Sequence, residues 1–120
     1  MLNKLREKIL LLLEEAQKDT NMKYYNKAVS AAYFAARMAA ESFIAERMKH
    51  LPKRDDKLAN ILRNLGFESL SSILMELYNL RKKADYGERF MSEKDSEKAI
   101  LYAKTLTLDY VYFRGFPFRG

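Results

Sequence analysis

The chain contains no cysteine, one histidine, four glycines and two prolines among its 120 residues. Without cysteine, disulfides, thiolate nucleophiles and zinc sites built on cysteine are excluded. The histidine, His50, lies in a predicted loop and has no partner for a catalytic triad or a metal site, so we expect it to be solvated. The glycines lie near predicted helix ends or the C-terminus, so no phosphate loop of the Walker or Rossmann type exists. We therefore expect no metal and no cofactor.

Long apolar runs are absent as well. No segment approaches the roughly 20 consecutive apolar residues that a membrane span requires. The run from Ile9 to Leu13 is followed at once by Glu14 and Glu15, and no small-residue cleavage site appears. The sequence predicts a cytoplasmic protein without a membrane partner.

Apolar and charged residues are present in the proportions of a folded domain, 48% and 32%. The length fits one domain with a substantial core but not two. The formal net charge of +6 gives a basic surface that would attract nucleic acid, nucleotides or an acidic partner. Because the charges are scattered and form no polybasic arm, a soluble surface with a basic bias explains them equally well.

Apolar residues recur at helical spacing and predict five helices. In chain order these cover approximately residues 2–18, 24–49 and 57–65, a fourth helix that ends near 86–87, and 92–113. The second helix has Ser30 as its only polar residue between Ala28 and Ala36, which is typical of a central helix. Short connections and the lack of a strand pattern indicate an all-α, antiparallel up-and-down bundle of four long helices and one short helix. We expect one bundle domain over residues 1–113 and a C-terminal tail over residues 114–120.

Local signals set the predicted ends of the first three helices. Residues 19–23 are predicted to form a turn because their side chains compete for backbone hydrogen bonds. Pro52 interrupts the connection after the second helix. Asp55 or Asp56 is expected to cap the third helix.

Glycine and serine mark the later helix ends. Gly66 is predicted to end the third helix in the left-handed conformation, and Gly87 to end the fourth by the same means. Ser92, which is followed by carboxylates, is expected to cap the fifth helix through its hydroxyl group.

The fourth helix carries the first candidate site. Spacings of three and then four residues place Tyr78, Arg81 and Asp85 on one helical stripe. In one interpretation Arg81 and Asp85 form an ordinary exposed ion pair worth about 0.3 kcal/mol. In the other, the stripe faces a groove in which Arg81 binds phosphate oxygens and a tyrosine stacks on a base. Spacing alone leaves both interpretations open.

A second candidate group lies on the second helix. Tyr33 and Arg37 are four residues apart and can face the same groove, and Tyr24 and Tyr25 begin the same helix. The alternative is that these tyrosines fill the edge of the core and leave their hydroxyl groups at the surface.

Two stretches resemble a known family. The run Tyr25–Ile44, YNKAVSAAYFAARMAAESFI, is similar to the second helix of HEPN-domain proteins, and Leu80–Tyr86, LRKKADY, is similar to their motif late in the bundle. The second stretch resembles that of the small prokaryotic branch with an Arg-x-x-Ala-Asp-Tyr motif. Both motifs occur in the family's order and at its distance, so the resemblance covers nearly the whole chain.

The resemblance implies a helical bundle that commonly forms homodimers and is often encoded beside a minimal nucleotidyltransferase, frequently as a toxin–antitoxin pair. Many HEPN proteins are metal-independent ribonucleases in which an arginine and a histidine from two subunits meet at the dimer cleft. Arg81 matches that arginine, and Lys82 matches the polar residue after it. No histidine follows. Asp85 and Tyr86 lie where one is expected, and a carboxylate with an ordinary pKa of about 3.9 is a poor general acid at neutral pH.

We therefore expect a HEPN-like homodimer that binds a nucleotide or RNA and is the non-catalytic partner of a minimal nucleotidyltransferase. The residues expected at its binding site are Arg81, Lys82, Asp85, Tyr86, Tyr78, Tyr33 and Arg37. One alternative is a metal-independent ribonuclease with a degenerate motif, in which Arg81 stabilises the scissile phosphate and Asp85 or Tyr86 replaces the histidine. Another is a dimeric adaptor whose aromatic tail, Phe113–Phe118, docks on a second protein.

Overall fold

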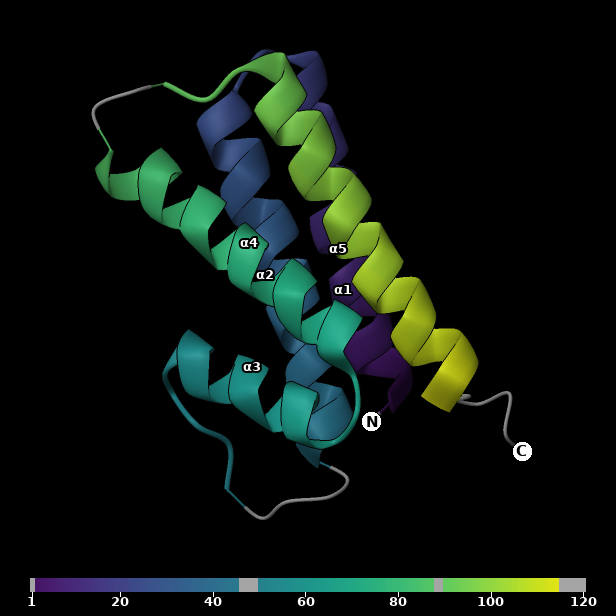
Figure 1. Cartoon of the computed structure of the whole chain (residues 1–120). Coiled ribbons are helices and arrows are strands. Elements are labelled where there is room, and N and C mark those ends of the chain that lie inside the picture. The colour runs from purple at the N-terminus through teal and green to yellow at the C-terminus, as the bar shows by residue number, and fades with distance from the viewer. Residues whose placement is uncertain (1, 46–49, 88–89, 115–120) are drawn as a thin grey trace.

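Five helices form the structure, a computed structural model that describes residues 2–45, 50–87 and 90–114 (Figure 1). They are α1 (Leu2–Asn21), α2 (Tyr25–Ala45), α3 (Asp55–Asn64), α4 (Glu68–Tyr86) and α5 (Glu93–Arg114). Helices α1 and α4 run toward the end of the molecule where α5 begins, and α2 and α5 run back (Figure 1). No strand occurs within the described ranges. The predicted all-α bundle of four long helices and one short helix is therefore confirmed.

Helix α2 is the centre of the bundle and contacts each of the other four helices. Its buried residues are Ala28, Val29, Ala31, Ala32, Tyr33, Ala35, Ala36, Ala39, Ala40, Phe43 and Ile44. Alanine favours the helix and lets neighbouring backbones approach closely, while the larger side chains fill the remaining space. On α4, Leu74 and Leu77 are fully buried against this core. The central position predicted for the second helix is confirmed.

Helix α1 extends to Asn21, so the turn predicted over residues 19–23 is wrong in its first half. The Thr20 hydroxyl donates a hydrogen bond of 2.9 Å to the Ala16 carbonyl, and the Gln17 amide donates to Asn21 Oδ1 at 3.2 Å. These side chains were expected to compete with the hydrogen bonds of the helix. They instead form hydrogen bonds with groups of the same helix. The chain reverses after the end of α1, where Lys23 adopts a positive φ of 67°.

Helix α3 begins at Asp55, two residues earlier than predicted, and neither aspartate is its N-cap. The N-cap is Arg54, which makes no side-chain capping bond. Asp55 and Asp56 lie in the first turn, where negative charge is favoured by the helix dipole. Asp55 is also buried, which gives it the role described below.

The two internal glycines end their helices for different reasons. Gly66 has a φ of +98°, and the amide of Phe67 closes back on the Leu62 carbonyl, so the predicted left-handed end is confirmed. At Gly87 φ is −79°, so the same prediction is wrong there. A Cβ at Gly87 would lie 2.5 Å from the Lys83 carbonyl oxygen, and the absent side chain is what allows this approach.

Helix α5 begins with the predicted serine cap. The Ser92 hydroxyl accepts a hydrogen bond from the Asp95 amide at 3.2 Å, and the Asp95 carboxylate accepts one from the Ser92 amide at 2.9 Å. The helix ends at Arg114, one residue beyond the prediction. The predicted end of the second helix near Lys49 and residues 115–120 of the predicted tail lie outside the described residues. In the part of the chain that the structure describes, none of the helices combines the length and apolarity required to cross a bilayer.

Candidate functional site

A buried ion pair joins α2 to the start of α3. Arg37 Nη1 lies 2.5 Å from Asp55 Oδ1, and the Tyr33 hydroxyl donates a hydrogen bond to the same oxygen. Both charged side chains are nearly enclosed, with 13% and 10% of their surfaces exposed. Arg37 Nη2 also donates to the carbonyls of Pro52 and Lys53 at 3.0 and 3.2 Å. This cluster therefore fixes the segment before α3 against the central helix.

Burial and charge alter the acidity of two members of the cluster. Burial, followed by the hydrogen bond to Asp55, raises the pKa of Tyr33 to about 12. Burial alone would lower the pKa of Arg37, but its interactions with Tyr33 and Asp55 outweigh that effect and raise the pKa. The protein therefore favours a neutral phenol beside a charged guanidinium group.

The raised pKa of Tyr33 predicts a loss of stability at high pH. The unfolded chain releases this proton near pH 10.0, whereas the folded protein holds it to about pH 12. The stabilisation is therefore complete below pH 10 and is lost as the pH rises toward 12, a change of roughly 2–3 kcal/mol. We expect urea denaturation at several pH values to show a smaller decrease for Tyr33→Phe than for the wild type. Equal decreases would contradict the assignment.

Arg81 is held between α4 and α2. Its Nε lies 3.0 Å from Asp85 Oδ2, and the Ser30 hydroxyl donates to Asp85 Oδ1 at 3.0 Å. The guanidinium carbon lies 5.1 Å from the ring centroids of both Tyr33 and Phe34, within the range of cation–π attraction. The side chains of Arg81 and Asp85 are 25% and 29% exposed. The pair is thus partly enclosed and anchored to α2, and is not the ordinary exposed pair of the first interpretation.

One donor of Arg81 remains unused within the described residues. Its buried Nε donates no hydrogen bond, since the contact with Asp85 is an ion pair without hydrogen-bond alignment. A buried donor without a partner is energetically costly. Because this nitrogen is buried and lies 3.0 Å from Asp85 Oδ2, its proton is not accessible to a ligand in the pocket.

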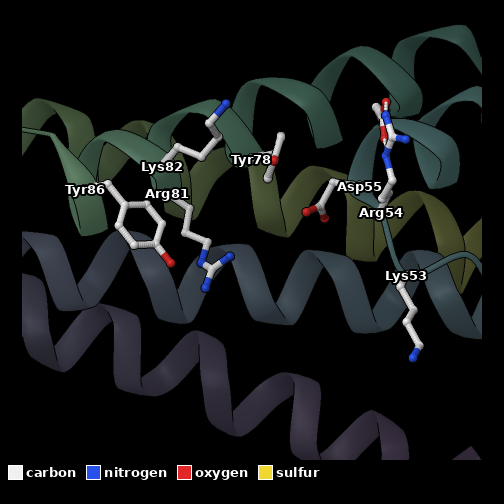
Figure 2. A pocket seen from close by; sticks show the side chains of 8 residues that line it. Lys53, Arg54, Asp55, Tyr78, Arg81, Lys82 and Tyr86 are labelled. Carbon is white, nitrogen blue, oxygen red and sulfur yellow. Dashed lines mark hydrogen bonds and ion pairs between the residues drawn. The ribbon is translucent and has the colours of Figure 1, made fainter.

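A pocket of about 560 Å³ opens between α4 and the segment that leads into α3 (Figure 2). Its lining consists of Lys53, Arg54, Asp55 and Asp56 from that segment and Tyr78, Arg81, Lys82 and Tyr86 from α4. Figure 2 shows Tyr86 and Arg81 toward one end, Tyr78 in the middle and Arg54 and Lys53 toward the other end. Its volume is typical of a site for one small organic ligand.

Positive charge dominates this lining, because four cationic side chains face two carboxylates. Asp55 is already neutralised by Arg37. Asp56 is paired with Arg54, whose Nη2 and Nε lie 2.6 and 3.1 Å from its two oxygens. Their hydrogen bonding raises the pKa of Arg54 and lowers that of Asp56. The pocket is therefore an environment that favours anions.

The remaining lining residues differ in exposure and in the contacts that their side chains make. The Lys82 ammonium lies 5.1 Å from the centroid of the Tyr78 ring and covers it. Tyr86 is 78% exposed, and no ring or cation of the described residues contacts its ring. Lys53 is exposed, and its ammonium has no hydrogen-bond or ion-pair partner among the described residues.

The structure separates the predicted site residues into two groups. Tyr78, Arg81, Lys82 and Tyr86 line the pocket directly. The remaining three lie behind the lining. Asp85 contacts Arg81, whereas Tyr33 and Arg37 both contact Asp55. His50, Tyr24 and Tyr25 are not among the lining residues, and Tyr24 is half exposed.

Sequence reasoning missed the half of the pocket contributed by residues 53–56. The signal was the run of two basic and two acidic residues after Pro52, of which only the acidic ones were considered, as helix caps. Among the described residues, no group of three or more histidine, aspartate or glutamate side chains could hold a metal ion.

A family model described as the HEPN domain matches residues 3–109, which include the whole pocket. This chain belongs to the HEPN domain family. HEPN domains are generally associated with nucleotides or RNA. No curated protein matches the sequence significantly.

The two stretches that resemble HEPN proteins lie side by side in this HEPN domain. Besides the Ser30–Asp85 bond, the Asn26 amide donates to the Ala84 carbonyl at 2.7 Å, and the Met91 amide donates to Asn26 Oδ1 at 3.0 Å. These contacts fix the end of α4, which carries Arg81, on α2.

Proposed function

We propose that this HEPN protein binds a nucleotide or RNA in the pocket between α4 and residues 53–56, without cleaving it. The observation that carries the proposal is a cationic pocket with tyrosines at its middle and one end. Arginine and lysine bind phosphate oxygens through charge-assisted hydrogen bonds, and an exposed aromatic ring stacks on a base. Arg81, Lys82, Tyr78 and Tyr86 contact the ligand, while Asp85, Tyr33 and Arg37 position the lining.

The same proposal includes an assembly. The chain is a homodimer of the branch with the Arg-x-x-Ala-Asp-Tyr motif and acts as the non-catalytic partner of a minimal nucleotidyltransferase in a two-component, toxin–antitoxin-like system. Residues 1–113 form its one domain and residues 114–120 its tail, of which Arg114 is the last residue of α5. Support comes from the family assignment and from the sequence LRKKADY at the end of α4.

The geometry favours binding over catalysis. The Asp85 carboxylate is engaged by both Ser30 and Arg81, so its oxygens already serve to hold Arg81 and α2 in place. The alternative ribonuclease would need Asp85 or Tyr86 to replace the missing histidine. The observation that favours it is the position of Arg81 in the lining of a cationic pocket, since a guanidinium group can stabilise a phosphate in a transition state. The adaptor hypothesis rests on Phe113–Phe118, whose side chains lie outside the described residues.

Binding and cleavage are separated by one experiment on the purified protein. RNA is incubated with the protein in chelator and its cleavage is followed, and binding of the same RNA and of nucleotides is titrated. We expect no cleavage. Arg81→Ala should weaken binding about 10- to 100-fold, because a charge-assisted hydrogen bond contributes about 1.5–3 kcal/mol. Lys83→Ala is the matched control, since Lys83 is an exposed cation of α4 that does not line the pocket.

The outcomes discriminate among the three functions. Cleavage that persists in chelator and is lost in Arg81→Ala would make the protein a ribonuclease and overturn the non-catalytic proposal. Equal binding by Arg81→Ala and the wild type, with both variants folded by circular dichroism, would remove Arg81 from the site. No binding of either ligand would leave the adaptor function.

A further inference from the structure

The pocket is elongated and chemically different at its two ends. Tyr78 and Tyr86 are eight residues apart on α4, which corresponds to about 12 Å along the helix axis. Tyr86 lies at one end, while Arg54 and Lys53 lie beyond Tyr78 at the other (Figure 2). A ligand that uses both ends needs an aromatic group and a separate, strongly anionic group on one extended molecule.

We propose that the pocket takes a nucleoside 5′-polyphosphate, with its base on Tyr86 and its terminal phosphates on Lys53 and Arg54, where they displace Asp56. This inference rests on the proposed function and names the ligand class of the same site.

The end of the pocket that takes the base is assigned by which of the two tyrosine rings can stack on it. The Tyr78 ring is covered by the Lys82 ammonium at 5.1 Å and lies 6.5 Å from the Tyr33 ring. Tyr86 is 78% exposed, and no described ring or cation contacts its ring. A base therefore stacks on Tyr86 without displacing a ring or a cation of the described residues.

The phosphate end is assigned by its donors. Arg54 already binds a planar anion, since two of its nitrogens donate hydrogen bonds to the two carboxylate oxygens of Asp56. These side chains are 68% and 45% exposed, so the pair contributes little and exchanges readily. Phosphate oxygens offer Arg54 the same forked geometry with more charge, and the exposed Lys53 ammonium, which has no ion-pair partner among the described residues, joins them.

Arg81 and Lys82 lie next to Tyr86, on the side toward Tyr78 (Figure 2). They lie where the ribose and the first phosphate of a ligand spanning the pocket would pass. The ionised Asp56 opposes the incoming phosphates at the far end, so binding includes the replacement of one anion by another at Arg54.

A single small ligand suits the pocket better than a nucleic-acid strand. Its volume of about 560 Å³ falls in the range of sites that enclose one organic ligand. Proteins that bind single strands present several aromatic rings along a continuous groove. Of the two tyrosines in this lining, Tyr78 is covered by Lys82, which leaves the exposed Tyr86 as the single ring for a base among the described lining residues.

The inference is tested by calorimetric titration of the full chain with AMP, ADP, ATP and a short oligoadenylate in metal-free buffer. We expect affinity to rise with each added phosphate, and Lys53→Ala to flatten this series. Asp56→Asn should tighten ATP several-fold because it removes the competing carboxylate. Tyr86→Ala should weaken AMP, ADP and ATP alike by about 10-fold, the usual effect of losing one stacked base. Lys83→Ala serves as the exposed control and should match the wild type.

Two results would overturn the inference. One is equal affinity for AMP and ATP, and the other is an Asp56→Asn variant that binds ATP no more tightly than the wild type. Oligoadenylate binding that depends on Arg81, without binding of any mononucleotide, would also overturn it but would leave the proposed function intact. If neither the oligonucleotide nor the nucleotides bind, both proposals fail.

Discussion

Replacing Asp55 by alanine is expected to lower the free energy of unfolding by about 3 kcal/mol, measured by urea denaturation. The substitution leaves Arg37 as a charge that is 13% exposed, with Glu41 at 3.3 Å as its remaining carboxylate partner among the described residues. It also removes the acceptor of the buried Tyr33 hydroxyl. Removing one member of a buried pair is costly because the desolvated partner loses its compensation. The expected value lies at the lower end of the usual range because Glu41 remains.

Two further variants separate this mechanism from a general effect of mutation near α3. Asp56→Ala, at the neighbouring position, removes an exposed carboxylate and should change stability little. The double variant Arg37→Met with Asp55→Leu should recover part of the lost stability, since a buried pair can be replaced by apolar side chains of similar size, while the Tyr33 hydroxyl still lacks its acceptor. If Asp55→Ala and Asp56→Ala were equally stable, the buried pair would not be a stabilising element.

The bundle was predictable because its helices are specified by local repeats. Apolar residues at helical spacing define the buried stripes, and the nearly unbroken apolar face of α2 matches a helix that contacts all four others. The Ser92 cap and the Gly66 turn involve residues a few positions apart, which spacing rules describe directly.

The incorrect or missing predictions have two causes. Some side chains have partners that are distant in the sequence, and one backbone position lies unusually close to a carbonyl group. Asp55 was considered only as a cap, because its partner Arg37 is 18 residues away and no spacing rule connects them. The Ser30–Asp85 bond spans 55 residues and was equally invisible. At Gly87 the determinant is a close approach to the Lys83 carbonyl, whereas the prediction assumed a positive φ. Helical spacing carries no information of these kinds.

The same distinction explains what was predicted at the candidate site. Tyr78, Arg81 and Lys82 follow one another on a single helix, and spacing grouped two of them correctly on one stripe. Lys53 and Arg54 belong to a connection, and only the packing of α3 against α4 brings them opposite Arg81. Half of a pocket between two elements therefore escapes prediction from either element alone.

Reversing two charges of the pocket should abolish ligand binding without unfolding the protein. Lys53 and Lys82 are both exposed and line the pocket from opposite sides. The double variant Lys53→Glu with Lys82→Glu is expected to bind ATP or RNA more than about 100-fold more weakly, because each phosphate contact contributes about 1.5–3 kcal/mol and becomes a repulsion. Its unfolding transition should remain close to that of the wild type, since surface substitutions of this kind have small effects.

A matched variant separates pocket contacts from the charge of the whole molecule. Lys83→Glu with Lys94→Glu reverses two exposed lysines outside the pocket. Each reversal removes two charge units, so both double variants take the formal net charge from +6 to +2. If binding depends on local contacts, only the pocket variant loses it, and the wild type's decrease of affinity with salt persists in the control. Equal weakening by both variants would instead mean that the basic surface attracts the ligand as a whole, and the pocket would lose its assignment.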